Sequence, residues 1–211
     1  MRSLKTAVLK VDPARPDHGT IARAARAIRE GAIVAFPTET VYGLAANRLD
    51  ASAVSRLYKV KGRPRGKPLT VHIADLSCIR KLGCRVNGEA KALIDKFWPG
   101  PLTIVLRRGS RGKVGFRMPA NKVALYLIAA SKVPVVAPSA NLSGSSPPKS
   151  AREVLKHLDG RIDMLIDSGR TRVGVESTVV DLSRRPAVIL REGAIGREEL
   201  ESVIPDIEWK K

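Results

Sequence analysis

Aromatic residues make up only 4% of this 211-residue chain, and cysteine occurs only twice. A chain with so few aromatic rings must build its core from aliphatic side chains, and its 44% of hydrophobic residues is ordinary for a globular protein. Cys78 and Cys84 lack the C-x-x-C spacing of a zinc pair, and two cysteines cannot form a disulfide framework. We therefore expect ordinary thiols in a reducing compartment, which is typical of a cytoplasmic protein.

Sequence signals for membranes and for common catalytic centres are also missing. Residues 1–11 carry charges but no apolar signal-peptide region, and no apolar run approaches the ~20 residues that a membrane span needs. His18, His72 and His157 lie far apart, so they predict no local metal site. Neither a G-x-S-x-G nor an H-E-x-x-H motif is present. We expect neither membrane binding nor a metal held by the protein itself.

Acidic residues are few beside the basic ones. The chain has 38 Lys and Arg against 20 Asp and Glu, which gives a net charge of +18. Such an excess favours polyanionic partners such as nucleotides or RNA, although generic solubility would also account for it. We expect any binding to RNA to be electrostatic and nonspecific, so its affinity should fall steeply with salt.

The hydrophobic pattern mixes helices and strands without strict alternation. We expect helices over residues 20–30, 51–60, 87–97, 121–131 and 150–157. We expect strands over residues 32–36, 69–73, 102–106, 114–117, 133–137, 164–166, 178–182 and 188–190. No linker or repeat divides the chain, so the sequence predicts one α/β domain over residues 1–211 with a mixed sheet.

Three segments place basic or hydroxyl residues at turns. Residues 59–67 form a dense basic run whose prolines and glycines predict a shaped loop exposed to a cleft, with guanidinium groups suited to phosphate. It is not a Walker A loop, because the glycine spacing is one residue short and Pro68 replaces the magnesium-binding Ser or Thr. Residues 138–144 and 37–44 follow apolar strands, where α/β folds bind ligands, but their polar side chains could equally cap helices or satisfy turns.

Taken together and in order, these pieces resemble the YrdC-like family, the threonylcarbamoyl-AMP synthases. The resemblance runs from about residue 31 to 193 through the segments 36–44, 61–64, 67–72, 98–103, 115–119, 139–144, 176–179 and 190–193. It implies a twisted, mixed, open sheet flanked by helices, with a large basic cleft whose rim is altered by a short segment at 107–113. It also implies ATP-dependent synthesis of L-threonylcarbamoyl-AMP from L-threonine and bicarbonate, with release of pyrophosphate, for the modification of adenosine beside the tRNA anticodon.

The resemblance also implies roles for individual residues. A catalytic tetrad would comprise Lys61, Arg63, Ser139 and Asn141. ATP would be contacted by Arg63, Lys67, Lys113, Ser139, Pro147 and Arg191. Threonine would be contacted by Thr40, His72, Arg117, Ala137 and Ser177. Mg²⁺ would be carried with ATP and take few protein ligands.

The family also implies partners and a domain arrangement. The product would pass to a separate threonylcarbamoyl transferase that acts on tRNA. Longer members carry an additional C-terminal domain, which we do not expect in this chain.

Two other functions stay open on the sequence. A non-catalytic RNA-binding module of ribosome or tRNA maturation would suit the charge, although no paired-aromatic RNA motif is visible. A carbamoyl-adenylate enzyme, like the YrdC-like domain of hydrogenase maturation proteins, would be larger and carry zinc-finger cysteines. Conversion of ATP to AMP and pyrophosphate, measured with and without threonine and bicarbonate, separates all three.

Overall fold

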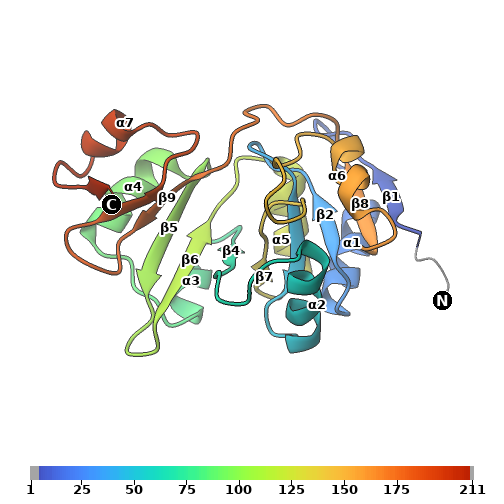
Figure 1. Cartoon of the computed structure of the whole chain (residues 1–211), viewed down its shortest axis with the longest axis horizontal. Helices are drawn as coiled ribbons and strands as arrows, with labels where there is room; N and C mark the ends of the chain where they lie inside the picture. Colours follow the sequence, from blue (N-terminus) through green and yellow to red (C-terminus); the bar gives the residue numbers. More distant parts are fainter. Residues whose placement is uncertain (1–4, 210–211) are drawn as a thin grey trace.

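The protein is built on one twisted sheet. In the computed structural model, which describes residues 5–209, 11 strands are joined in the order β1-β8-β2-β3-β7-β4-β6-β5-β9-β10-β11. The sheet is mixed, with parallel pairs such as β4 with β6 and antiparallel pairs such as β5 with β6. The sheet runs from β1 at one end of the molecule to β11 at the other and does not close (Figure 1). The predicted mixed, open α/β sheet is confirmed, whereas the large basic cleft stays a prediction.

The strands are short, with two to six residues each. They are β1 Ala7–Lys10, β2 Val34–Phe36, β3 Gly43–Asn47, β4 Thr70–His72, β5 Leu102–Arg107, β6 Lys113–Arg117, β7 Val135–Val136, β8 Met164–Asp167, β9 Thr178–Asp181, β10 Val188–Arg191 and β11 Glu208–Trp209. The helices are α1 His18–Arg29, α2 Ala51–Lys61, α3 Ser77–Lys81, α4 Gly88–Phe97, α5 Lys122–Ser131, α6 Ala151–Leu158 and α7 Arg197–Glu201.

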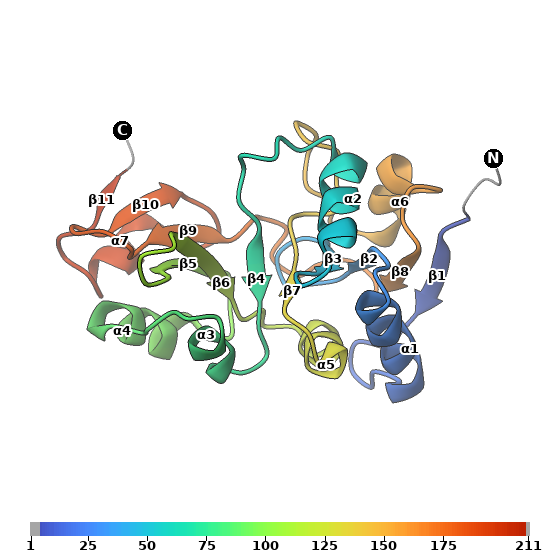
Figure 2. The ribbon, with the colours of Figure 1, turned by 90° about the horizontal axis from the view of Figure 1, so that it is seen from below.

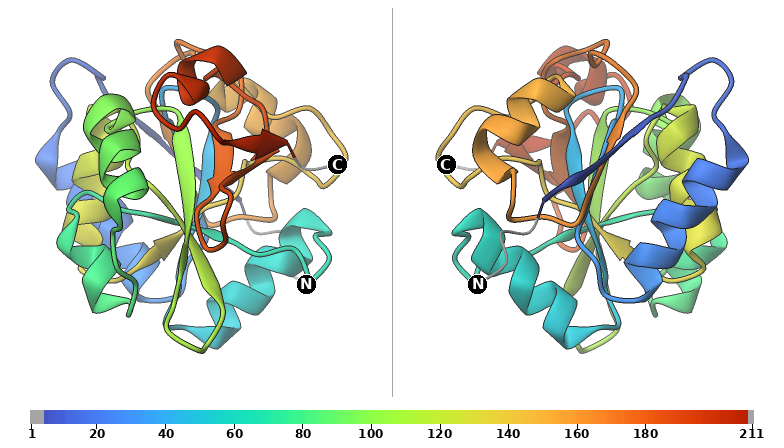
Figure 3. Two further views of the ribbon diagram at one scale, coloured as in Figure 1. Left: turned by 90° about the vertical axis from the view of Figure 1, so that its left-hand side faces the viewer. Right: turned by 90° about the vertical axis from the view of Figure 1, so that its right-hand side faces the viewer.

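Helices cover the sheet on both faces. Helices α1, α3, α4 and α5 lie on one face, and α2, α6 and α7 lie on the other (Figures 2 and 3). Among the described residues, the buried hydrophobic side chains include only three aromatic rings, those of Phe36, Tyr42 and Phe116, so the predicted aliphatic core is confirmed. No helix in the described part of the chain is long and apolar enough to cross a membrane.

Local sequence signals set most helix starts. Asp50, Asn87, Asn121 and Ser150 each stand just before a helix and accept a hydrogen bond from a backbone N–H of its first turn. Such capping satisfies donors that have no partner within the helix. The Oδ1 of Asn121, for example, accepts from the Ala124 nitrogen at 3.0 Å.

Some elements differ from those the sequence predicts. Strands β1, β3 and β11 and helices α3 and α7 were not expected. The two helices have only five residues each, and β3 reads Gly-Leu-Ala-Ala-Asn, in which glycine and alanine have low strand propensity. The prediction of a loop for the whole basic run is wrong at its start, because Lys59 and Lys61 belong to the last turn of α2.

Candidate functional site

Strand register brings a row of polar side chains onto one face of the sheet. His72 at the end of β4 lies in register with Arg117 at the end of β6, and Thr70 lies in register with Gly115. Since side chains alternate across a strand, all four positions face the same side. Gly115 has no side chain, and a Cβ there would already contact the side chains of Thr70, Thr103 and Val105 at 3.6–3.7 Å.

The same row continues across the next strands. Thr103 of β5 lies in register with Val179 of β9, and Val179 is in turn opposite Arg191 of β10. The intervening residues, such as Ile104 and Phe116, point to the other face, where they are fully buried. Period-two alternation therefore separates a polar face, which carries the site, from an apolar face, which forms the core.

Two adjoining pockets lie over this polar face. The first, which we call the polar pocket, includes Thr38, His72, Thr103, Arg117, Ala137, Ser139, Glu176 and Ser177 in its lining. The second, which we call the basic pocket, includes Lys67, Leu69, Val105, Lys113, Gly115, Val179 and Leu190. Arg63 and Arg191 line both pockets, so two guanidinium groups stand at the boundary between them.

The residues expected to contact threonine gather in the polar pocket. His72, Arg117, Ala137 and Ser177 line it, and Thr40 is buried behind it against Arg117. Most of those expected to contact ATP gather around the basic pocket, which is lined by Arg63, Lys67, Lys113 and Arg191. Ser139 lines the polar pocket, while Pro147 and Asn141 line neither.

Arg117 is held from behind by a buried carboxylate. Its Nη2 donates to Oε1 of Glu39 at 2.8 Å and to Oγ1 of Thr40 at 2.7 Å, and the two charged side chains are only 6% and 3% exposed. The second oxygen of Glu39 and the Nε of Arg117 are buried without a hydrogen-bond partner among the described residues. The guanidinium is therefore fixed at one nitrogen, while the side chain lines the pocket.

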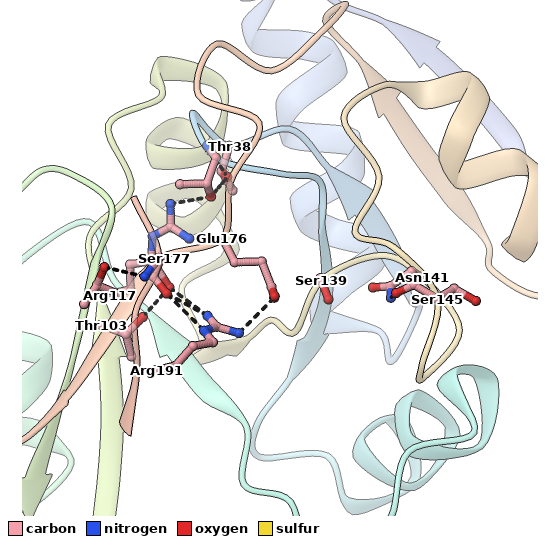
Figure 4. A network of polar contacts seen from close by, with 12 residues as sticks. Thr38, Thr103, Arg117, Ser139, Asn141, Ser145, Glu176, Ser177 and Arg191 are labelled. Atoms are coloured by element: carbon pink, nitrogen blue, oxygen red, sulfur yellow. Dashed lines mark hydrogen bonds and ion pairs between the residues drawn. The ribbon is translucent and has the colours of Figure 1, made fainter. Parts of the chain in front are cut away.

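Arg191 is fixed by the segment that precedes β9. Its Nη1 donates to Oε1 of Glu176 at 2.9 Å, and its Nη2 donates to the backbone carbonyl of Ser177 at 2.8 Å (Figure 4). The Ser177 hydroxyl in turn lies 2.9 Å from that of Thr103. Gly193 permits this approach, because a Cβ there would lie 2.2 Å from the backbone oxygen of Glu176.

Lys61 does not face the pockets, so its expected exposure is wrong. The residue is 2% exposed, and its ammonium donates to the backbone carbonyls of Ser139 and Asn141, the latter at 2.7 Å. Burial, and then the charge of Arg63, lower the pKa of Lys61 to about 8. Lys61 thus joins the end of α2 to the loop that carries Ser139.

Asn141 also turns into its own loop. Its Nδ2 donates to the backbone carbonyls of Leu142 at 2.9 Å and Ser145 at 2.6 Å. Figure 4 shows it apart from the network around Arg117 and Arg191, with Ser139 between them. Of the expected tetrad, Arg63 and Ser139 line the polar pocket, whereas Lys61 and Asn141 support the loop behind Ser139.

Sequence reasoning gave no role to Glu39, Thr38, Thr103 or Glu176, although each lies in a segment that carried the resemblance. Glu39 and Glu176 form the ion pairs that hold Arg117 and Arg191. The sequence did contain a signal for Glu39 and Glu176, because each is an acidic residue inside a segment whose other residues suit anions. Only the fold shows which arginine each carboxylate meets.

His72 remains uncharged at neutral pH. Its ring lies edge-on to Phe36, and burial, followed by the nearby charge of Arg117, lowers the pKa of His72 to about 3. The imidazole can therefore serve as a neutral hydrogen-bonding group next to a cation.

Acid is expected to destabilise the protein through His72. The folded-state pKa lies below the ordinary value of 6.5, so the unfolded chain binds the proton first as the pH falls through 6.5. Each pH unit below 6.5 should then cost up to about 1.4 kcal/mol until the folded pKa is reached. Urea unfolding at pH 7 and pH 5 measures this, and His72→Asn should lose less stability than the wild type. Equal losses in the two proteins would contradict the expectation; His18→Asn, at an exposed site, is the control.

Comparison with known proteins gives consistent matches. The family model for Sua5, YciO and YrdC proteins, described as telomere recombination, matches residues 26–193. The threonylcarbamoyl-AMP synthase of Pyrococcus abyssi is 49% identical over 87% of this chain, and that of Bacillus subtilis is 46% identical over 90%. The chain spans only 57% and 58% of the length of these two relatives. The crystal structure of P. abyssi Sua5 complexed with L-threonine superposes with a TM-score of 0.92 at 46% identity, covering 97% of this chain and 63% of that one.

Proposed function

Because the chain belongs to the Sua5, YciO and YrdC family, we propose that it uses ATP to convert L-threonine and bicarbonate into L-threonylcarbamoyl-AMP and pyrophosphate. The observation that carries the proposal is the pair of adjoining pockets, one polar and one basic, with Arg63 and Arg191 at their boundary. One pocket suits an amino acid, the other suits a nucleotide, and the reaction joins the two.

The polar pocket suits threonine. Arg117 can bind the amino-acid carboxylate with the part of its guanidinium that Glu39 does not use, because the hydrogen bonds to Glu39 and Thr40 both come from Nη2. Nη1 keeps both of its N–H donors, and a hydrogen bond from a guanidinium to a carboxylate is among the strongest in proteins. Hydroxyl groups of Thr38, Thr103 and Ser177 provide further donors and acceptors around the pocket. The relative solved with L-threonine supports this choice of amino acid.

The basic pocket suits the phosphates of ATP. Lys67 is exposed on the loop after α2, and Arg63 is held by its Nη2 donating to the Pro68 carbonyl at 2.9 Å. Lys113 also lines this pocket, and its Nζ lies 2.7 Å from Oδ2 of Asp181. An arginine already anchored on backbone carbonyls loses less entropy when it binds a phosphate, so Arg63 is partly preorganised.

The chemistry explains why cations dominate. The threonine amine and bicarbonate first give an N-carboxy anion and water. An oxygen of this anion then attacks the α-phosphorus of ATP, and one P–O bond forms while the bond to pyrophosphate breaks. The nucleophile is already an anion, so the protein must bring like charges together and stabilise the charge of the transition state. Arg63 and Arg191, between the two pockets, are placed for that task.

Mg²⁺ would arrive with ATP and neutralise charge on its phosphates. The residues fit this arrangement, because no cluster of three potential metal ligands exists within residues 5–209. Glu176 is the one carboxylate lining either pocket, and it already pairs with Arg191. A metal bound mainly by phosphates and water needs few protein ligands.

The product is a mixed anhydride of a carbamate and AMP, which hydrolyses unless an acceptor consumes it. We place the reaction in the cytoplasm, where a separate threonylcarbamoyl transferase would pass the group to adenosine beside the anticodon of tRNA.

Pyrophosphate release tests the proposal. The purified chain with Mg-ATP should release pyrophosphate only when L-threonine and bicarbonate are both present, because neither alone forms the attacking anion. Omission of each reagent in turn is the control. Turnover without threonine would overturn the proposal, and RNA binding without any turnover would indicate a non-catalytic module.

A further inference from the structure

A third pocket lies beyond the basic pocket, at the edge of the sheet where Arg107 pairs with Lys113, and is lined by arginines. It includes Arg85, Arg107, Arg184 and Arg185 together with Asn87 and Ser183, and it shares no lining residue with the polar or basic pocket. Its volume is about 750 Å³, against about 290 Å³ for the basic pocket measured in the same way. We call it the arginine groove. Nothing in the proposed reaction uses it.

The groove sits where three connecting segments meet. Arg107 ends β5, Arg184 and Arg185 belong to the turn after β9, and Arg85 precedes α4. Because β5 and β9 are parallel, their carboxyl ends lie at the same edge of the sheet, at the lower left of Figure 1. Strand β6 runs antiparallel to β5, so its last residue, Arg117, lies at the opposite edge, whereas its first residue, Lys113 of the basic pocket, pairs with Arg107.

The positive charge of the groove is not neutralised by the protein. Its lining contains no Asp or Glu, and none of its four arginines forms an ion pair within the described residues. By contrast, Arg117 and Arg191 in the candidate site each meet a carboxylate. Four like charges around one concavity repel one another, and a bound polyanion would relieve that repulsion.

The arginines of the groove are exposed, and one is already oriented. All four are solvent-exposed, so their guanidinium groups are accessible to a ligand. Arg107 donates from Nε and Nη2 to the carbonyl of Ser183 at 3.3 and 3.1 Å, which ties the end of β5 to the turn after β9. Positive charge continues beside the groove, because the side chain of Arg108 lies against Gly83, which lines it.

We propose that the arginine groove binds the phosphate backbone of RNA, at a place separate from both pockets of the candidate site. Guanidinium groups bind phosphates bidentately, and several arginines along a groove can contact successive phosphates of one strand. The concave shape suits a strand better than the flat surface of a bilayer. The net charge of +18 would draw such a strand in from a distance. This proposal does not depend on the enzymatic one.

A pair of double variants with equal charge loss tests the groove. Binding of a fluorescein-labelled 20-nucleotide single-stranded RNA is followed by anisotropy at several salt concentrations. We expect Arg184→Ser/Arg185→Ser to weaken binding about tenfold or more at low salt and to reduce the slope of log K against log salt by about 1.4. The control is Arg23→Ser/Arg26→Ser, which removes two exposed arginines of α1 and should change the affinity less than about twofold.

The outcomes separate this inference from its rivals. Equal weakening in both double variants would reduce the effect to general charge and overturn the groove as a site. Displacement of the RNA by ATP would place the RNA in the basic pocket and also overturn it. Loss of binding to vesicles containing phosphatidylserine, with RNA binding unchanged, would assign the groove to membranes. Threonine-dependent pyrophosphate release should stay unchanged in the groove variant, and Arg85→Ser provides a second test should the double variant fold poorly.

Discussion

Replacing Arg63 with alanine is expected to slow threonine-dependent pyrophosphate release by about a hundredfold or more. Arg63 lines both pockets, and the carbonyls of Lys67 and Pro68 hold its guanidinium in place. Loss of one charge-assisted contact to a transition state costs roughly 3–4 kcal/mol, which corresponds to that change in rate. Steady-state kinetics under saturating ATP and threonine measures the loss as a fall in kcat.

Arg65→Ala is the matched control for Arg63→Ala. Arg65 lies in the same basic run, but its side chain is exposed and donates to the Ser55 hydroxyl on α2, and it lines neither pocket. Its loss should leave kcat within about twofold. Similar rates in both variants would mean that the basic run acts only through its overall charge. Thermal unfolding of both variants checks that any loss of rate is not a loss of fold.

The arrangement of the fold could be predicted from local patterns only in part. Long periodic segments such as α5 and β5 were expected close to their observed bounds, since hydrophobic period and capping are local properties. Strand β3 was missed, because its small residues are strand-forming only between β2 and β7, to which they pair. The order of the 11 strands depends on contacts between distant segments, which no local pattern contains.

The candidate site shows a similar division. The segments suited to anions could be found from residue type and position after strands, and the register of β4 with β6 explains why His72 and Arg117 meet. The burial of Lys61 could not be foreseen, because a lysine at the end of a helix is usually solvated. Three oxygens of the loop at Ser139–Asn141 surround its ammonium, and they come from residues about eighty positions away in the chain.

Recognition of threonine should depend on the shape of Arg117 and not only on its charge. Arg117→Lys keeps the positive charge but loses the planar guanidinium, so a single ammonium cannot keep the hydrogen bonds to Glu39 and Thr40 and also donate to the carboxylate as Nη1 can. Hydrogen bonds to charged groups contribute about 1.5–3 kcal/mol, and we therefore expect the KM for threonine to rise by about tenfold or more. The KM for ATP should rise much less, because Arg117 lines the polar pocket and not the basic one. Separate titrations of the two substrates measure both constants.

Variants of Glu39 complete the test, because this carboxylate holds Arg117 in place through the 2.8 Å contact to its Nη2. Glu39→Gln keeps an acceptor oxygen of the same size, so the KM for threonine should stay close to that of the wild type. Glu39→Ala leaves a buried guanidinium without its partner, which should cost about 3–5 kcal/mol of stability and raise the KM for threonine. An arginine that served only to pair with Glu39 would leave the threonine KM unchanged in Arg117→Lys. A rise in the ATP KM alone would mean that Arg117 faces the phosphates, and the assignment of the two pockets would have to be exchanged.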